Sequence, residues 1–236
     1  MDNENKTDKY SVFLNIIVWG AMWGIFEATV GYLLHGLSFG YSWLIWYPAV
    51  CFFMANVYRK TKKVSSILFI GLLCASIKML NLFLPGRIDK VINPAISIAF
   101  EALVAAAVVF AAKCLFKEKR KNLFTKALIA LTMNTGWRIL YILYLLFLVP
   151  NWIRDISVIS SAEKFIPFFI TQNLITTILI FTGYQFKYYI FKPVDITEHN
   201  LLKLSNIIPS RAMLFIQTGL AALILFTNIV LQLMLK

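Results

Sequence analysis

Long apolar stretches alternate along this chain with short polar segments that are mostly basic. Each apolar stretch is near the ~20 residues that a helix needs to cross a bilayer, so the pattern predicts transmembrane helices. The stretch 41–58 is the shortest and contains Pro48, so six crossing helices plus one re-entrant or interfacial piece is the alternative count. The seven stretches are 12–37, 41–58, 64–84, 94–116, 123–149, 165–190 and 212–235.

Composition points to the same class of protein. Hydrophobic residues make up 60% of the 236 residues, charged residues make up 14%, and the mean hydropathy is +0.74. Soluble domains are usually about 45–50% apolar and about 25% charged. We therefore expect an all-α integral membrane protein, a single polytopic domain built as a bundle of six to seven transmembrane helices. The three cysteines have no metal-ligand spacing, and we predict no metal site and no cofactor.

The positions of the basic residues predict the topology. The net charge is +12, and most of the 23 Lys and Arg residues precede residue 12 or lie in 58–64, 113–126 and 187–211. With seven crossings these segments all fall on one side, which the positive-inside rule makes cytoplasmic. We expect a multi-pass protein of the plasma membrane with a cytoplasmic N-terminus. Because the basic residues lie in short blocks between apolar stretches, we expect them to contact anionic lipid rather than nucleic acid.

The first apolar stretch carries a carboxylate among small residues. Gly20, Gly24, Glu27 and Gly31 fall within about 40° of one line along a helix. Small residues let a neighbouring helix approach closely, and a carboxylate in hydrocarbon needs a partner. Two interpretations stay open: tight packing with Glu27 in a structural ion pair, or a face that lines a polar cavity.

Two acids and two bases lie inside apolar stretches, and most of the intramembrane polar side chains lie in the half farther from the basic segments. Such residues usually face the bundle interior and pair with one another, so we expect an acid within salt-bridge reach of a base. Their shared depth predicts a pocket that opens to the external side. Arg138 could grip a carboxylate or phosphate in two-pronged fashion, and Trp23, Trp137 or Tyr141 could stack on a flat ring. The predicted solute-binding residues are Glu27, Lys78, Glu101, Asn134, Arg138, Gln172 and Asn173.

No enzyme motif emerges from the sequence. It contains no His-Glu-x-x-His, Gly-x-Ser-x-Gly, Walker or dinucleotide motif, so we predict no catalytic residue. Three alternatives to solute binding remain. Glu27 or Glu101 with His35 could perform acid–base chemistry on a lipid-like substrate, or the ion pairs could serve only to hold together a structural or assembly protein. Secondary transport is disfavoured because no inverted repeat is visible.

Three segments resemble the substrate-binding S components of energy-coupling factor (ECF) transporters: EATVGYLLH at 27–35, GLLCASIK at 71–78 and NPAISIAFEA at 93–102. The resemblance covers roughly the first half of the chain. It implies a small helical membrane protein that captures a vitamin or similar solute from outside. It also implies a transmembrane coupling subunit and two ATP-binding subunits as partners. By the same resemblance, the face of Gly20, Gly24 and Ala28 docks on the transmembrane partner.

Overall fold

The computed structural model describes residues 2–36, 41–115, 122–205 and 210–235, and these contain helices and no strand. The prediction of an all-α membrane protein is confirmed, because six helical stretches of the described chain are long and apolar enough to cross a bilayer. They are Lys9–Gly31, Ser65–Phe83, Asp89–Leu115, Leu123–Phe147, Ala162–Gln185 and Ala212–Met234. These correspond to six of the seven predicted spans.

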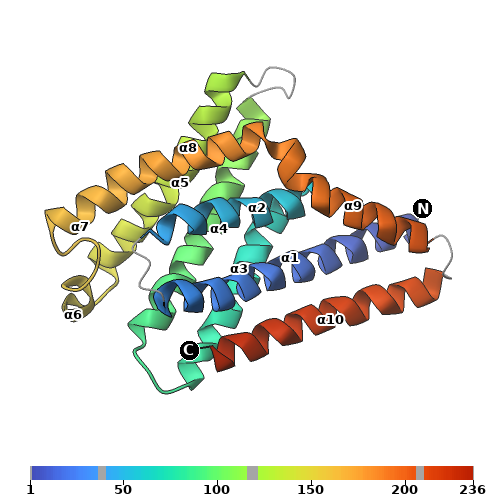
Figure 1. Cartoon of the computed structure of the whole chain (residues 1–236), viewed down its shortest axis with the longest axis horizontal. Helices are drawn as coiled ribbons and strands as arrows, with labels where there is room; N and C mark the ends of the chain where they lie inside the picture. Colours follow the sequence, from blue (N-terminus) through green and yellow to red (C-terminus); the bar gives the residue numbers. More distant parts are fainter. Residues whose placement is uncertain (1, 37–40, 116–121, 206–209, 236) are drawn as a thin grey trace.

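The remaining predicted span, 41–58, forms α2 (Trp43–Thr61). Its 19 residues extend about 28 Å, close to the ~30 Å of a hydrocarbon core. Asn56, Arg59 and Lys60 lower its hydropathy, and it is not among the six most apolar stretches. It nevertheless packs against α1, α3 and α8 and lies among them in Figure 1. The stretch that was the least certain membrane span from the sequence therefore forms a helix that packs in the interior of the bundle.

Six helices close on themselves around the core. α1 packs on α3, α3 on α4, α4 on α5, α5 on α8, α8 on α2, and α2 on α1. α10 lies outside this circuit and packs mainly along α1, as the blue and red helices of Figure 1 show. The other described elements, in chain order, are α1 (Asp2–Gly36), α3 (Ser65–Met79), η1 (Leu80–Phe83), α4 (Asp89–Leu115), α5 (Leu123–Phe147), α6 (Asn151–Arg154), α7 (Ala162–Ile166), η3 (Pro167–Thr171), α8 (Gln172–Gln185), α9 (Lys187–Ser205) and α10 (Ser210–Met234).

Glycines set the closest helix approaches in the circuit. A Cβ on Gly71 of α3 would overlap the Cβ of Ala102 on α4. A Cβ on Gly136 of α5 would lie 2.7 Å from Cγ1 of Val104 on α4, closer than real Cβ contacts come. Small residues at these positions allow α4 to pack tightly between α3 and α5. This packing holds the polar side chains of α4 and α5 close to one another.

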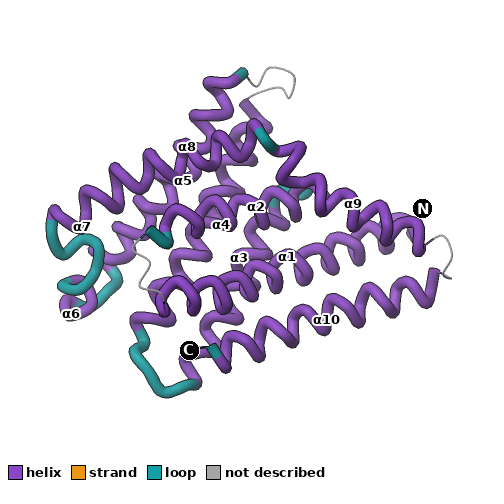
Figure 2. The backbone as a smooth tube through the Cα atoms, in the orientation of Figure 1, coloured by secondary structure: helices purple, strands orange, loops and turns teal. Residues whose placement is uncertain are grey.

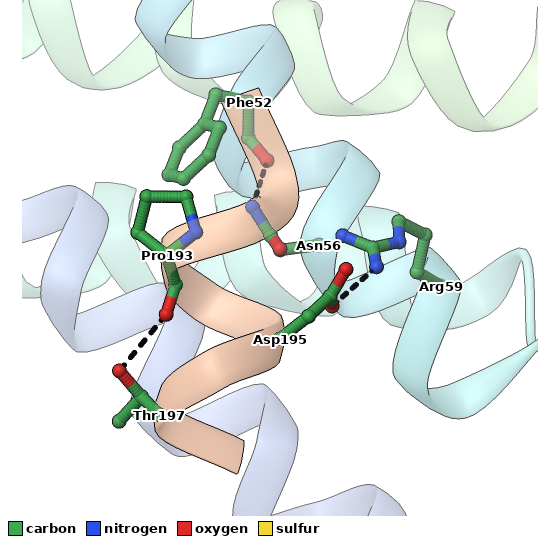
Figure 3. A network of polar contacts seen from close by, with 6 residues as sticks. All are labelled: Phe52, Asn56, Arg59, Pro193, Asp195 and Thr197. Carbon is green, nitrogen blue, oxygen red and sulfur yellow. Dashed lines mark hydrogen bonds and ion pairs between the residues drawn. The ribbon is translucent and has the colours of Figure 1, made fainter. Parts of the chain in front are cut away.

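The segment after α8 forms the helix α9 (Lys187–Ser205), and residues 206–209 lie outside the described part of the chain. Side chains of α9 contact the C-terminal end of α2 (Figure 3). Arg59 Nη2 lies 2.6 Å from Asp195 Oδ1, and its guanidinium lies 4.1 Å from the centre of the Phe191 ring. The other face of the contact is apolar, because Phe191 stacks on Phe52 with ring centres 5.8 Å apart.

Candidate functional site

A cavity of about 370 Å³ opens at one end of the bundle. It lies between the start of α4, one side of α5 and the segment that follows α6. Figure 2 shows the loops before α4 and around α6 at this same end. This is the end away from most of the basic segments, which the topology prediction makes external. The lining residues are Arg87, Asp89, Asn93, Tyr141, Ile153, Ile156, Ser157 and Val158.

An arginine–aspartate pair forms one wall of the cavity. Arg87 donates from Nε to Asp89 Oδ1 at 3.0 Å and from Nη2 to Asp89 Oδ2 at 2.7 Å. This bond to Asp89 raises the pKa of the Arg87 guanidinium above its ordinary value. Asp89 is the first residue of α4, where a carboxylate also suits the positive end of the helix dipole. The pair is formally neutral, so this wall offers hydrogen-bonding atoms without net charge.

A second arginine positions the opposite wall. Arg154 of α6 donates to the carbonyl of Leu146 at 2.7 Å, and to those of Leu145 and Val149 at 3.3 Å each. The last carbonyls of a helix have no partner within the helix, so Arg154 satisfies the end of α5. The same bonds hold the start of the lining segment 153–158 against α5.

Arg138 of α5 lies one helical turn before Tyr141 and is only 2% exposed. Its Nη1 donates to the carbonyl of Phe168 at 2.7 Å, and its Nε donates to Asn134 Oδ1 at 3.4 Å. The guanidinium lies 4.7 Å from the ring centres of both Trp137 and Phe168. Phe168 belongs to a π-helical turn, η3, that begins at Pro167. Arg138 is thus held by the protein itself, in a charged hydrogen bond and between two rings.

The predicted amide residues tie α5 to α8. Asn134 Nδ2 donates to the carbonyl of Asn173 at 2.8 Å, and lies 2.6 Å from Thr176 Oγ1 and 3.0 Å from Thr177 Oγ1. In return, Asn173 Nδ2 donates to Thr135 Oγ1 at 2.8 Å. Gln172 is half-buried, and its backbone carbonyl accepts from Thr176 at 2.6 Å. The contacts of Asn134 and Asn173 are structural bonds between α5 and α8, whereas that of Gln172 lies within α8.

The two predicted carboxylates are nearly fully buried. Glu27 is 4% exposed, and its Oε1 accepts from Trp23 Nε1 at 3.3 Å. Glu101 is 3% exposed, and its Oε1 accepts from Ser97 Oγ at 3.4 Å. Glu101 Oε2 has no hydrogen-bonding partner among the described residues. Each carboxylate therefore receives one long hydrogen bond from its own helix.

The predicted direct ion pair between these acids and a buried base is wrong. Arg138 uses its donors on Phe168 and Asn134, whereas Lys78 is only half-buried and forms no hydrogen bond with a described residue. The opposite charges do lie within electrostatic reach, Glu27 of Lys78 and Glu101 of Arg138.

The small-residue face of α1 is covered by helices of the same chain. A Cβ on Gly20 would lie 2.9 Å from Leu73 Cδ2 of α3, and a Cβ on Gly24 would overlap the side chain of Asn228 on α10. Gln232 of α10 also donates to the Gly24 carbonyl at 3.2 Å, and Ala28 is 3% exposed. A partner can therefore reach Gly24 only if α10 moves away, and Gly20 would still be covered by α3.

None of the seven predicted residues lines the cavity, whereas the predicted stacking residue Tyr141 does. The side chain of His35 lies outside the described part of the structure. Arg87, Asp89 and Asn93 line the cavity but are not among the site residues predicted from the sequence. Their spacing ahead of Pro94, with an acid at a helix start, was the available signal.

Comparison with protein-family models, with curated proteins and with solved structures returns no match. Among the described residues, no group of three or more His, Cys, Asp or Glu side chains is placed to hold a metal ion. The cavity and the polar residues next to it are therefore the features from which a function can be inferred.

Proposed function

We propose that this membrane protein binds a small polar solute in the cavity at the end of the bundle. The observation that carries the proposal is an open space of about 370 Å³ between a neutral Arg87–Asp89 pair and Tyr141. Ligand sites usually measure about 300–1,000 Å³ and combine apolar walls with a few polar groups. This cavity is at the small end of that range, which favours a solute of the size of an amino acid, a nucleobase or a small vitamin.

The proposed direction is capture from outside, at the plasma membrane, with the N-terminus in the cytoplasm. The support is the concentration of basic residues in segments at the opposite end of the helices. Labelling of Lys119→Cys and Ser157→Cys in intact cells tests it. An impermeant reagent should reach position 157 and not position 119. The reverse pattern would turn the cavity toward the cytoplasm.

The seven residues predicted to bind solute do not line the cavity. Tyr141 links the two regions, because it lines the cavity and lies three residues after Arg138 on α5. In this proposal a carboxylate-bearing solute that binds Nη1 of Arg138 replaces the Phe168 carbonyl there. Glu27, Lys78 and Glu101 then act on the solute through charge rather than through contact.

We also propose a role as the substrate-specific subunit of an ECF-type uptake system, supported by the resemblance of the three segments in the first half. The chain would then need a transmembrane coupling subunit and ATP-binding subunits. Solute uptake by cells that produce the chain with and without such subunits tests this role. Uptake that is equal in both cells would remove the ECF assignment and leave solute binding untouched.

Binding itself is tested with the purified protein in lipid nanodiscs. Panels of vitamins, amino acids and nucleobases are screened by thermal shift and native mass spectrometry. Ser157→Trp should fill the cavity and abolish binding of any solute found, whereas Ser160→Trp, on the same loop but outside the lining, should retain it. Binding that survives Ser157→Trp would place the solute elsewhere.

A structural or assembly role is the second candidate, and one observation favours it. The side-chain amide of Asn134 and the Nη1 and Nε atoms of Arg138 donate to atoms of the chain itself, as expected for residues that hold a bundle together. If no solute in the panels binds and Arg138→Gln mainly destabilises the protein, this role is the better account.

A further inference from the structure

Two lysines share one tyrosine ring where α5 begins and α8 ends. Lys126 Nζ, in the first turn of α5, lies 5.3 Å from the centre of the Tyr184 ring. Nζ of Lys187, the first residue of α9, lies 5.1 Å from the same centre. An ammonium group is attracted to the face of an aromatic ring. Tyr184 therefore brings together two positive charges from parts of the chain that are far apart in the sequence.

The two ammonium groups have no counter-charge within the described part of the chain. Neither forms an ion pair or a hydrogen bond with a described residue. Arg59 differs, because its guanidinium lies over a ring and is also paired with a carboxylate, that of Asp195. Lys187 and Tyr184 are exposed and Lys126 is half-buried, so a ligand can reach the pair. Two like charges beside one ring repel each other, and an anion between them would relieve that repulsion.

The two lysines lie at the depth of lipid headgroups. The 25 residues of α5 extend about 37 Å, more than the ~30 Å of a hydrocarbon core, so its first turn reaches the headgroup region. Tyr184 is the last residue but one of the apolar stretch Ala162–Gln185. Tyr188 and Tyr189 follow on α9, which continues from the end of α8 in Figure 1, and are 68% and 69% exposed. Tyrosine is enriched at the boundary between membrane and water.

We propose that Lys126, Tyr184 and Lys187 form a binding site for the headgroup of an anionic phospholipid, whose phosphate lies between the two ammonium groups. The long side chains of lysine allow both charges to converge on one phosphate. A phospholipid suits this site better than a soluble anion, because its acyl chains hold the phosphate at this depth of the membrane. The site does not depend on the proposed solute cavity, whose lining contains none of the three residues.

Titration of the purified full-length protein with dioctanoyl phosphatidylglycerol, followed by native mass spectrometry, tests the site. The wild type should bind this lipid more tightly than dioctanoyl phosphatidylcholine. Lys126→Gln combined with Lys187→Gln should weaken binding of phosphatidylglycerol roughly 25-fold, because each lysine near an anionic surface contributes about fivefold. Lys164→Gln combined with Lys192→Gln is the matched control, since it removes the same charge from exposed positions away from Tyr184 and should retain binding. Equal weakening in both double variants, or equal affinity of the wild type for both lipids, would overturn the proposal.

Two further measurements separate the lipid site from its alternatives. Lys126→Arg combined with Lys187→Arg keeps both charges and should keep the preference for phosphatidylglycerol, which tests the site even if the glutamine variants fold poorly. Loss of the preference in this arginine variant would contradict recognition by charge. Inorganic phosphate in excess should not displace phosphatidylglycerol from the wild type, because it has no acyl chains in the membrane. Displacement by inorganic phosphate would make a soluble anion the ligand and overturn the assignment to a lipid.

Discussion

Gly24 of α1 lies directly against the side chain of Asn228 on α10, with no room for a Cβ between them. We expect Gly24→Leu to push α10 away from α1, because the added side chain must occupy the space of the Asn228 amide. Gly219→Leu on α10 is the matched control, since no atom lies within 4 Å of a Cβ at that position.

Cross-linking of Tyr10→Cys to Thr218→Cys by a short bismaleimide measures this displacement, because the hydroxyls of Tyr10 and Thr218 are hydrogen-bonded across the same two helices. In a background without the native cysteines, Gly24→Leu should reduce cross-linking several-fold, and Gly219→Leu should not. Equal cross-linking in both variants would show that α10 does not depend on this contact.

Arg138→Gln should destabilise the protein by about 2–4 kcal/mol, because it removes a charged hydrogen bond to a buried carbonyl and leaves buried polar groups unpaired. Arg138→Lys should recover only part of the loss, since an ammonium lacks the planar group that lies between Trp137 and Phe168. Equilibrium unfolding in mixed micelles measures both, with the exposed Lys164→Gln as control. Wild-type stability in Arg138→Gln would contradict a structural contribution from this residue.

In the contact between α2 and α9, the aromatic ring should matter more than the ion pair. Asp195→Asn removes a pair whose side chains are 32% and 50% exposed, and such pairs contribute about 0.2–1 kcal/mol. Phe191→Ala removes both the stack on Phe52 and the ring beneath Arg59, and should cost more. Protease cleavage within α9 should rise most in Phe191→Ala, and Ile196→Ala, at an exposed position, serves as control. The opposite order would make the ion pair the main contact.

Arg154→Gln should loosen the wall of the cavity without unfolding the bundle. Without its bonds to Leu146 and Val149, the end of α5 loses partners for its last carbonyls, and the segment 153–158 loses its anchor. Hydrogen exchange should rise in 148–158 and stay unchanged in α3 and α4. Unchanged exchange in 148–158 would show that packing alone holds the loop.

The helices were predictable because crossing a bilayer demands length and apolarity, both visible in the sequence. The residues at which the helices begin and end were less predictable. The fourth predicted span begins at Pro94, but α4 begins at Asp89, which suits the helix N-terminus, and the helix continues through Pro94. Likewise, the sequence left open whether the stretch 41–58, which forms α2, crosses the membrane. In the structure α2 packs against three other helices, and hydropathy does not reveal such contacts.

For the site, the sequence indicated which polar residues are buried but not what they contact. Glu27, Glu101 and Arg138 are all buried as expected for intramembrane charges, yet no direct ion pair joins them. The partner of Arg138 is a backbone carbonyl in a π-helical turn, a feature that no side-chain pattern marks. The cavity combines residues from α4, α5 and the segment after α6, so it depends on the order of helix packing rather than on any local motif.

The position of α10 outside the closed circuit has a consequence for how the protein is made. The six helices of the circuit have all been synthesised once α8 is complete, while α9 and α10 are still to come. At about 5–20 residues per second, a ribosome needs roughly 3–10 s to reach the end of α10. During that interval the glycine face of α1 has no helix of its own chain at Gly24 and is open to lipid or to an insertion factor. The packing of α10 on α1 is therefore a late event of biogenesis. Until it occurs, another membrane helix can occupy the face of α1 at Gly24 without competing with α10.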